Sequence, residues 1–190
     1  MTTFLIIWLG QIISIIGSGL TSFALAVWIF GETGKAVPLA ITVLAGNLTR
    51  LLLSPIAGSL ADRWNRRKLM IAADTGDALV TLAAVLLVSG GRLEVWHAYL
   101  VALASAAFSA FQEPAYMASI TMLVPKEHLT RASGMMQAGQ ALEMLIAPAL
   151  AGVLFGVIGF RGIVIIDFIT YFFAIAALLV VAIPQPQLSA

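Results

Sequence analysis

Six long apolar stretches constrain the fold of this chain more than any other feature. A helix needs roughly 20 consecutive apolar residues to cross about 30 Å of hydrocarbon. Stretches of that length cover residues 4–30, 38–61, 69–90, 97–124, 132–160 and 162–183, with a tight turn around Arg161 between the last two. The connections between them are short and polar. The sequence therefore predicts an all-α membrane protein, with six transmembrane helices in a single bundle over residues 1–190.

Composition agrees with a membrane protein and excludes several other classes. Of the 190 residues, 61% are hydrophobic and 10% charged, whereas soluble domains average about 45–50% and about 25%. A net charge of +1 gives no basic patch for nucleic acid. The chain has no cysteine, and its two histidines, His97 and His128, lie far apart. We expect no metal site and no cofactor. The first stretch is too long for a signal peptide, so we expect it to be retained.

Basic residues in the loops predict the orientation in the membrane. The second and fourth loops together hold six Lys and Arg, and the first, third and fifth hold three. Because cytoplasmic loops are enriched in these residues, we expect the second and fourth loops, and both termini, to be cytoplasmic.

Three ionisable residues on different predicted helices share one depth. Arg50, Glu113 and Glu143 each lie twelve residues from the predicted cytoplasmic end of their helix, which corresponds to about 18 Å. Transporters place substrate and coupling-ion sites near the midplane, and a glutamate there would load and release a proton. Alternatively, Arg50 pairs with one glutamate as a structural ion pair, and the other lies beside a water-filled cavity.

Three aspartates also fall inside predicted helices. Asp74 and Asp77 are three residues apart and therefore share a helix face. They either balance the charge of the neighbouring basic loop or serve the function. Asp167 lies about 9 Å below the outer face, where it would pair with Arg161 or cap a neighbouring helix.

Small residues recur at four-residue spacing in two of the predicted helices. They are Gly10, Ser14 and Ser18 in the first helix, and Gly152 and Gly156 in the fifth. Such spacing lets helix backbones approach closely in lipid, so we interpret both sets as packing residues.

The loop between the second and third helices carries the most specific motif. Residues 58–68 read GSLADRWNRRK and closely resemble the signature loop of the major facilitator superfamily, G-x-L-a-D-r-x-g-R-r. In that family the loop is a gate that holds the outward-facing state, which the resemblance assigns here to Gly58, Asp62, Arg63, Arg66 and Arg67, with Asp74 following. We expect Gly58 to let two helices meet, Asp62 to lie against a helix N-terminus and the arginines to pair across the cytoplasmic face. Asn65 replaces the usual second glycine and would adopt a left-handed turn.

Further segments resemble one subgroup of this superfamily, the drug:proton antiporters. APALAG at 147–152 is similar to the G-P-x-x-G-G segment of proton-coupled antiporters, with Pro148 and Gly152 kept, and would form a bendable, tightly packed helix. FQEPA at 111–115 and VPKEHL at 124–129 look like macrolide and siderophore exporters of the drug:proton antiporter type. The resemblance implies the N-terminal half of a twelve-helix fold built as a 3+3 inverted repeat, in a bacterial plasma membrane, with the C-terminal half absent. The fourth helix lacks the arginine that several related antiporters use in proton transfer, and Arg50 is the candidate to replace it.

Three functional hypotheses follow. The first is efflux of amphipathic drug-like or siderophore-like molecules by alternating access, with a proton as a possible partner. The second is an inactive fragment, or a half-transporter that needs a second six-helix half from the same chain, another chain or a second copy. The third, remote hypothesis is an intramembrane aspartyl protease around Gly76-Asp77, but no Tyr-Asp pair occurs. We therefore expect a transporter and not an enzyme.

Overall fold

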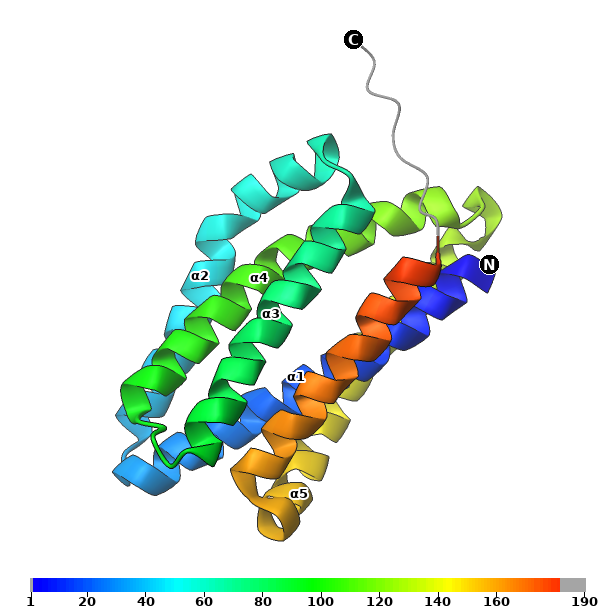
Figure 1. Ribbon diagram of the computed structural model, residues 1–190. Helices are drawn as coiled ribbons and strands as arrows, with labels where there is room; N and C mark the ends of the chain where they lie inside the picture. Colours follow the sequence, from blue (N-terminus) through cyan, green and yellow to red (C-terminus); the bar gives the residue numbers. More distant parts are fainter. Residues whose placement is uncertain (1, 182–190) are drawn as a thin grey trace.

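The computed structural model describes residues 2–181, and these form one bundle of long helices (Figure 1). Its elements are α1 (Thr2–Thr33), α2 (Ala36–Arg63), α3 (Arg66–Ser89), α4 (Val95–Leu123), a short 3-10 turn η1 (Lys126–His128) and α5 (Leu129–Val180). All five α-helices of this range are long and apolar enough to cross a membrane, so the all-α membrane class is confirmed. The last residues of the stretch predicted over 162–183, and the segment from Pro184, lie outside the described residues.

Helix α5 reverses its direction at Gly159 and so contains the last two predicted stretches. Gly159 has φ 67° and ψ −179°, a conformation that essentially only glycine adopts. It joins a first arm (129–158) to a second arm (160–180), which lie side by side in Figure 1 as yellow and orange ribbons. The turn was expected around Arg161, but it occurs two residues earlier because Gly159 is the residue that tolerates it.

Helix α1 packs closely on the second arm of α5 through a glycine. A Cβ atom on Gly10 would lie 2.7 Å from the Cβ of Ala177 and 2.8 Å from the carbonyl oxygen of Phe173, so a larger residue would force the helices apart. By contrast, Gly152 and Gly156 face open space in the described chain. Within residues 2–181 the first arm instead buries the face that carries Ala147 and Ala151, so packing through Gly152 and Gly156 stays a prediction.

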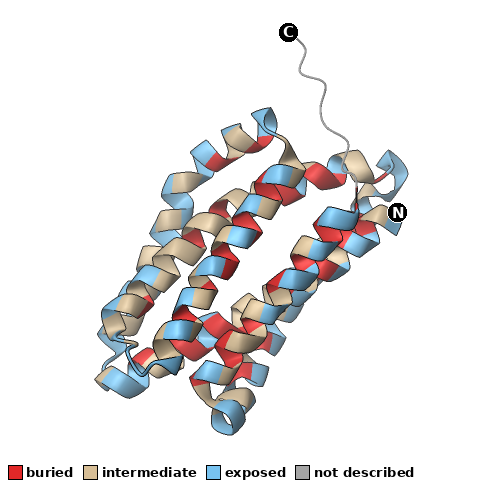
Figure 2. Ribbon diagram, in the orientation of Figure 1, coloured by how far each residue is buried: buried red, intermediate tan, exposed pale blue. Residues whose placement is uncertain are grey.

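Two clusters of buried apolar residues lie at opposite ends of the bundle. One contains Phe4, Met70 and Leu178, near the start of α1 and the end of α5. The other contains Ile29 and Phe160 at the opposite end. Figure 2 shows the buried residues running along the inside of the bundle between these ends. The polar side chains described below lie between the two clusters.

Helix α2 leaves most of its apolar surface uncovered. Its most hydrophobic window contains no buried residue, and Leu51 and Leu52 are 68% and 72% exposed. Figure 2 shows α2 as a pale blue and tan helix on the outside of the bundle. A surface of this kind needs lipid or another protein against it.

Candidate functional site

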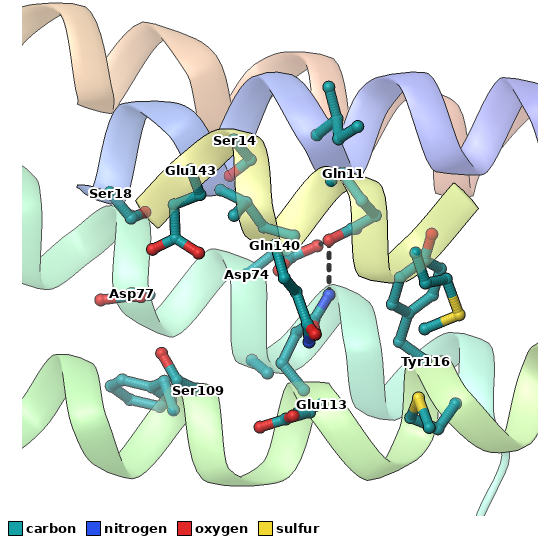
Figure 3. Close-up of a pocket in the computed structure, with 18 of the residues that line it drawn as sticks. Gln11, Ser14, Ser18, Asp74, Asp77, Ser109, Glu113, Tyr116, Gln140 and Glu143 are labelled. Carbon is teal, nitrogen blue, oxygen red and sulfur yellow. Dashed lines mark hydrogen bonds between the residues drawn. The ribbon is translucent and has the colours of Figure 1, made fainter. Parts of the chain in front are cut away.

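A polar cavity of about 190 Å³ lies in the middle of the bundle. All five α-helices contribute to its lining. Figure 3 shows polar side chains of α1, α3, α4 and α5 around it. The polar or ionisable residues around it are Gln11, Ser14, Ser18, Arg50, Asp74, Asp77, Ser109, Gln112, Glu113, Tyr116, Gln140, Glu143 and Tyr171. A second cavity of about 300 Å³ shares Ser18 and Arg50 with the first and adds Asp167.

Three aspartates form the buried part of this site, which we call the floor. Asp74, Asp77 and Asp167 are only 5%, 7% and 1% exposed. The first two come from α3 and the third from the second arm of α5. Within residues 2–181 none of them makes an ion pair, so Asp167 does not pair with Arg161, which is exposed. The floor therefore places carboxyl groups in the interior without a cation bonded to any of them.

A chain of amide side chains holds the first floor residue. Gln112 Nε2 donates to Gln11 Oε1 at 2.5 Å, and Gln11 Nε2 donates to Asp74 Oδ2 at 3.0 Å. These two hydrogen bonds connect α4, α1 and α3 across the bundle, and Figure 3 shows Gln11 and Asp74 side by side with a dashed line at Gln11. Asp74 thus has a hydrogen-bond partner on α1. This differs from the interpretation that it balances the charge of the basic loop.

Hydroxyl groups hold the third floor residue. Ser18 Oγ donates to Asp167 Oδ1 at 3.2 Å and lies 3.0 Å from the hydroxyl oxygen of Tyr171. Because Ser18 donates to the carboxylate, it accepts from Tyr171. The arrangement fixes the second arm of α5 against α1 through polar contacts, about two turns along α1 from the close approach at Gly10.

The three residues predicted to share one depth form the mouth of the cavity, which we call the rim. Arg50 and Glu113 are exposed, and Glu143 is half-buried. All three line the same cavity, and Arg50 and Glu113 both act electrostatically on Glu143. The structural ion pair between Arg50 and a glutamate is not formed within residues 2–181. The rim residues are therefore open to solvent or to a ligand.

The signature loop joins three helix ends through arginine. Arg67 donates from Nε to the carbonyl of Leu178 and from Nη2 to that of Leu179, both at 2.6 Å, so it holds the last turn of α5. Arg66 donates from Nη1 to the carbonyl of Ala118 in α4 at 2.9 Å. The expected pairing of arginines across this face thus occurs through carbonyl groups, which favour cations at helix C-termini.

Other expectations for the loop need correction. Asn65 has φ −65° and ψ 107°, so it is extended and not left-handed; its side chain accepts a hydrogen bond from the Lys68 backbone N–H and caps α3. Gly58 meets no neighbouring helix in the described chain, because the α2 face that carries it turns outward. Asp62 and Arg63 are exposed.

Several site residues were not singled out from the sequence. Gln11 and Tyr171 were not considered, and Ser14 and Ser18 were interpreted only as packing residues. A signal was present: Gln11, Ser14 and Ser18 are spaced three and four residues apart, which places them on one face of an otherwise apolar helix. Polar residues on one face of a membrane helix point to the protein interior.

The floor and the rim together give the site a strongly negative character. Five carboxyl groups, three on the floor and two on the rim, face a single guanidinium, that of Arg50. Uncompensated carboxylates in an apolar surrounding are costly. The site therefore attracts protons, metal cations or a positively charged molecule.

Comparison with known proteins identifies relatives over nearly the whole chain. A sequence model of the Major Facilitator Superfamily matches residues 7–190. Macrolide efflux protein A of Streptococcus pyogenes is 32% identical over 182 residues, which is 96% of this chain and 45% of that protein. The protein of the same name from Enterococcus faecalis is 32% identical over 152 residues, 80% of this chain and 47% of its own length. An uncharacterised MFS-type transporter of Bacillus subtilis, YfiS, is 26% identical over 145 residues, covering 76% of this chain and 34% of its own length. The chain spans about half the length of the macrolide efflux proteins that it matches.

Proposed function

The chain belongs to the major facilitator superfamily, and on this premise we propose that it forms the N-terminal half of a membrane exporter. The transported molecule is an amphipathic, positively charged, drug-like compound of the size of a macrolide. It crosses by alternating access, in which the central cavity opens to one side of the membrane and then to the other. The observation that carries this proposal is the acidic cavity between two clusters of buried apolar residues.

The rim residues bind the transported molecule in this proposal. Glu113 and Glu143 attract its positive charge, and Arg50 adjusts their combined charge. All three are at least partly exposed at the mouth of the cavity, so a large molecule reaches them without displacing the buried floor. Apolar residues that line the same cavity, such as Phe108 and Met117, contact the apolar parts of the molecule.

The signature loop serves as the gate at the cytoplasmic end. Its support is the pair of hydrogen bonds from Arg67 to the end of α5 and the bond from Arg66 to α4. Because these contacts join helix ends, breaking them would free the ends to separate. The same end carries most of the basic loop residues, so we place it and both termini on the cytoplasmic side of a bacterial plasma membrane.

A second six-helix half completes the cavity. The uncovered face of α2, together with the exposed apolar residues Leu145 and Val153 on the first arm of α5, provides the surface for it. The second half belongs to the same polypeptide, to another chain or to a second copy of this one. A partner on this face would also cover the exposed charges of the rim.

Accumulation of a fluorescent cationic macrolide in bacteria that express the intact transporter, which is this chain together with the second half that completes its cavity, tests this function. We expect lower accumulation than in cells with an empty vector. The double variant Glu113→Gln, Glu143→Gln should restore it, and the matched control Glu32→Gln, an exposed acid on α1, should not. If the double variant exports as well as the unmodified chain, the proposed role of the rim is wrong.

A further inference from the structure

A groove of about 560 Å³ lies at the end of the bundle opposite the signature loop. It is formed by the last turns of α1 and by the segment that begins α4, two regions that meet at the lower left of Figure 1. Its lining consists of Trp28, Glu32, Leu93, Glu94, Val95, Trp96 and Tyr99. None of these residues lines either of the two cavities described above. The groove is therefore a separate concavity, built from aromatic rings, aliphatic side chains and two carboxyl groups.

The two carboxyl groups give the groove a negative charge that no bonded cation balances. Glu32 and Glu94 are both exposed, and neither forms an ion pair within residues 2–181. The adjoining loops hold Lys35 and Arg92, which are exposed and do not belong to the lining. A ligand that complements the groove therefore carries a positive charge.

Helix capping accounts for one of these acids but not for the other. Glu94 is the N-cap residue of α4, where a negative charge is favourable. Glu32 lies in the last turn of α1, which ends at Thr33, and an acidic residue there opposes the helix dipole. Tryptophan and tyrosine are common at a membrane surface, but a surface position does not require this acid. The placement of Glu32 thus points to a ligand of opposite charge.

Neighbouring groups hold both indole rings of the groove in place. Trp96 donates from Nε1 to Glu94 Oε2 at 2.7 Å and packs on the ring of His97, with ring centroids 3.6 Å apart. Trp28 stacks on Phe160 with ring centroids 5.8 Å apart. Aromatic faces attract organic cations, and indole does so most strongly. Rings that are fixed before a ligand arrives bind it at a lower cost in entropy.

The lining suits an organic cation better than a metal ion. In the described chain no group of three or more His, Cys, Asp or Glu side chains could hold a metal. The walls of the groove are instead aromatic and aliphatic, with Leu93 and Val95 beside the rings. An ammonium group with carbon substituents satisfies the carboxylates and the apolar walls at the same time.

We propose that this groove binds an organic ammonium group. The positive charge lies between Glu32 and Glu94, and the carbon substituents contact Trp28, Trp96 and Tyr99. The headgroup of an ethanolamine lipid and a free amphipathic amine both offer this chemistry. The site is separate from the central cavity, and its occupation does not rest on the proposed function.

Equilibrium binding of radiolabelled benzyltrimethylammonium tests the groove without any transport. The intact transporter, which is this chain with its second half, is purified in nanodiscs of phosphatidylglycerol and a neutral glycolipid. Every measurement uses the double variant Glu113→Gln, Glu143→Gln as background, so that the charge of the rim does not hold the probe. We expect saturable binding that weakens between about 20 and about 300 mM salt, because salt screens exposed charges.

Variants assign the binding to the groove. Glu32→Gln combined with Glu94→Gln removes both charges and keeps an acceptor for the indole of Trp96, and we expect the affinity to fall about tenfold. Glu127→Gln makes the same change at an exposed acid of the opposite end and should leave the affinity unchanged.

A second pair of variants tests the aromatic wall. Trp96→Leu keeps an apolar side chain without the ring, and we expect the affinity to fall about threefold. Trp64→Leu is the matched control, because Trp64 is exposed to a similar extent, 60% against 52% for Trp96, and lies at the signature loop. This control should bind the probe as the background does.

The lipid composition distinguishes the two sources of the ammonium group. Phosphatidylethanolamine replaces the glycolipid at the same mole fraction, which leaves the surface charge unchanged. A lower affinity for the probe, absent when Glu32 and Glu94 are both replaced, identifies the lipid headgroup as the occupant; an equal affinity identifies a free organic cation.

Two results would overturn the proposal: no saturable binding in the glycolipid nanodiscs, or an affinity that the groove variants leave unchanged. The outcome is independent of export. Glu32→Gln should weaken binding in the groove and leave export intact, whereas the effect of the rim variant on export bears only on the proposed function.

Discussion

The floor and the rim carry the same chemical groups in two adjoining cavities but differ in their surroundings. Asp74, Asp77 and Asp167 are at most 7% exposed, and Asp74 and Asp167 accept hydrogen bonds from an amide and a hydroxyl. Glu113 and Glu143 are more accessible, and within residues 2–181 neither of them forms an ion pair. A buried carboxylate with fixed partners contributes to the fold, whereas an accessible one is available to a large molecule. The division of roles thus follows from burial and not from residue type.

The largest expected effect is the loss of the amide chain at the floor. Gln11→Leu removes the donor to buried Asp74 and the acceptor of half-buried Gln112. A hydrogen bond to a charged group contributes about 1.5–3 kcal/mol and a neutral one about 0.5–1.5 kcal/mol, so we expect a destabilisation of about 3 kcal/mol. Thermal unfolding in detergent measures it as a lower midpoint. A variant that unfolds at the same temperature as the unmodified chain would show that the floor contributes little to the fold.

A smaller loss of stability is expected at the other floor contact. Ser18→Ala removes the hydroxyl between Asp167 and Tyr171 without creating a clash, because the side chain becomes smaller. A hydrogen bond to a charged group contributes about 1.5–3 kcal/mol, and we expect a loss of about 2 kcal/mol by the same measurement. Ser54→Ala in α2, where the hydroxyl only bonds the carbonyl of Leu51 in its own helix, is the matched control and should lie close to the unmodified chain.

Substitutions at the floor contacts are expected to lower stability. Substitutions at the rim should instead change stability little and lower export clearly. Glu143→Gln removes one negative charge from the mouth of the cavity and keeps the shape of the side chain. We expect export of a cationic substrate to fall about tenfold, the equivalent of 1.4 kcal/mol. The initial efflux rate from preloaded cells gives this value. A rate that stays the same for a cationic substrate and falls for a neutral analogue would contradict an electrostatic role.

The smallest effect on stability is expected from Gln140→Leu, which is compared with Gln11→Leu. Gln140→Leu makes the same chemical change as Gln11→Leu, but Gln140 lines the cavity as an exposed residue. Surface substitutions usually change stability by no more than about 0.5 kcal/mol. Unfolding midpoints of the two leucine variants, measured side by side, should therefore differ widely. Equal unfolding midpoints of the two variants would contradict the distinction between buried and exposed polar residues of the cavity.

Much of the fold was predictable from the sequence because lipid leaves the backbone few choices. Long apolar stretches must be helical there, and the short loops between them leave room only for neighbouring helices. The boundary between the last two stretches was placed at a charged residue, Arg161, whereas the backbone reverses at Gly159. Hydropathy locates the ends of apolar stretches, but the conformation at a turn depends on which residue tolerates it.

The sequence predicted which three rim residues come together, but not which acidic residues are buried. The rise per residue of a helix places Arg50, Glu113 and Glu143 at one level, and the structure brings all three to one cavity. Rotation of each helix about its axis decides which residue lies inside. It depends on contacts far apart in sequence, such as Gln11 with Asp74 and Ser18 with Asp167. For that reason the aspartates, considered mainly for loop charge and helix ends, occupy the centre of the site.

Thiol labelling measures most directly whether the floor is dry and the rim is wet. The chain contains no cysteine, so a single introduced thiol reports on one position. Gln140→Cys places it on an exposed position of the first cavity, and Thr21→Cys places it on a buried position of the second cavity, which Asp167 also lines. With a charged, water-soluble maleimide and the purified chain, we expect Gln140→Cys to react about 100-fold faster, because buried groups react only through local opening. Equal rates at the two positions would contradict the division of the cavity into a dry floor and a wet rim.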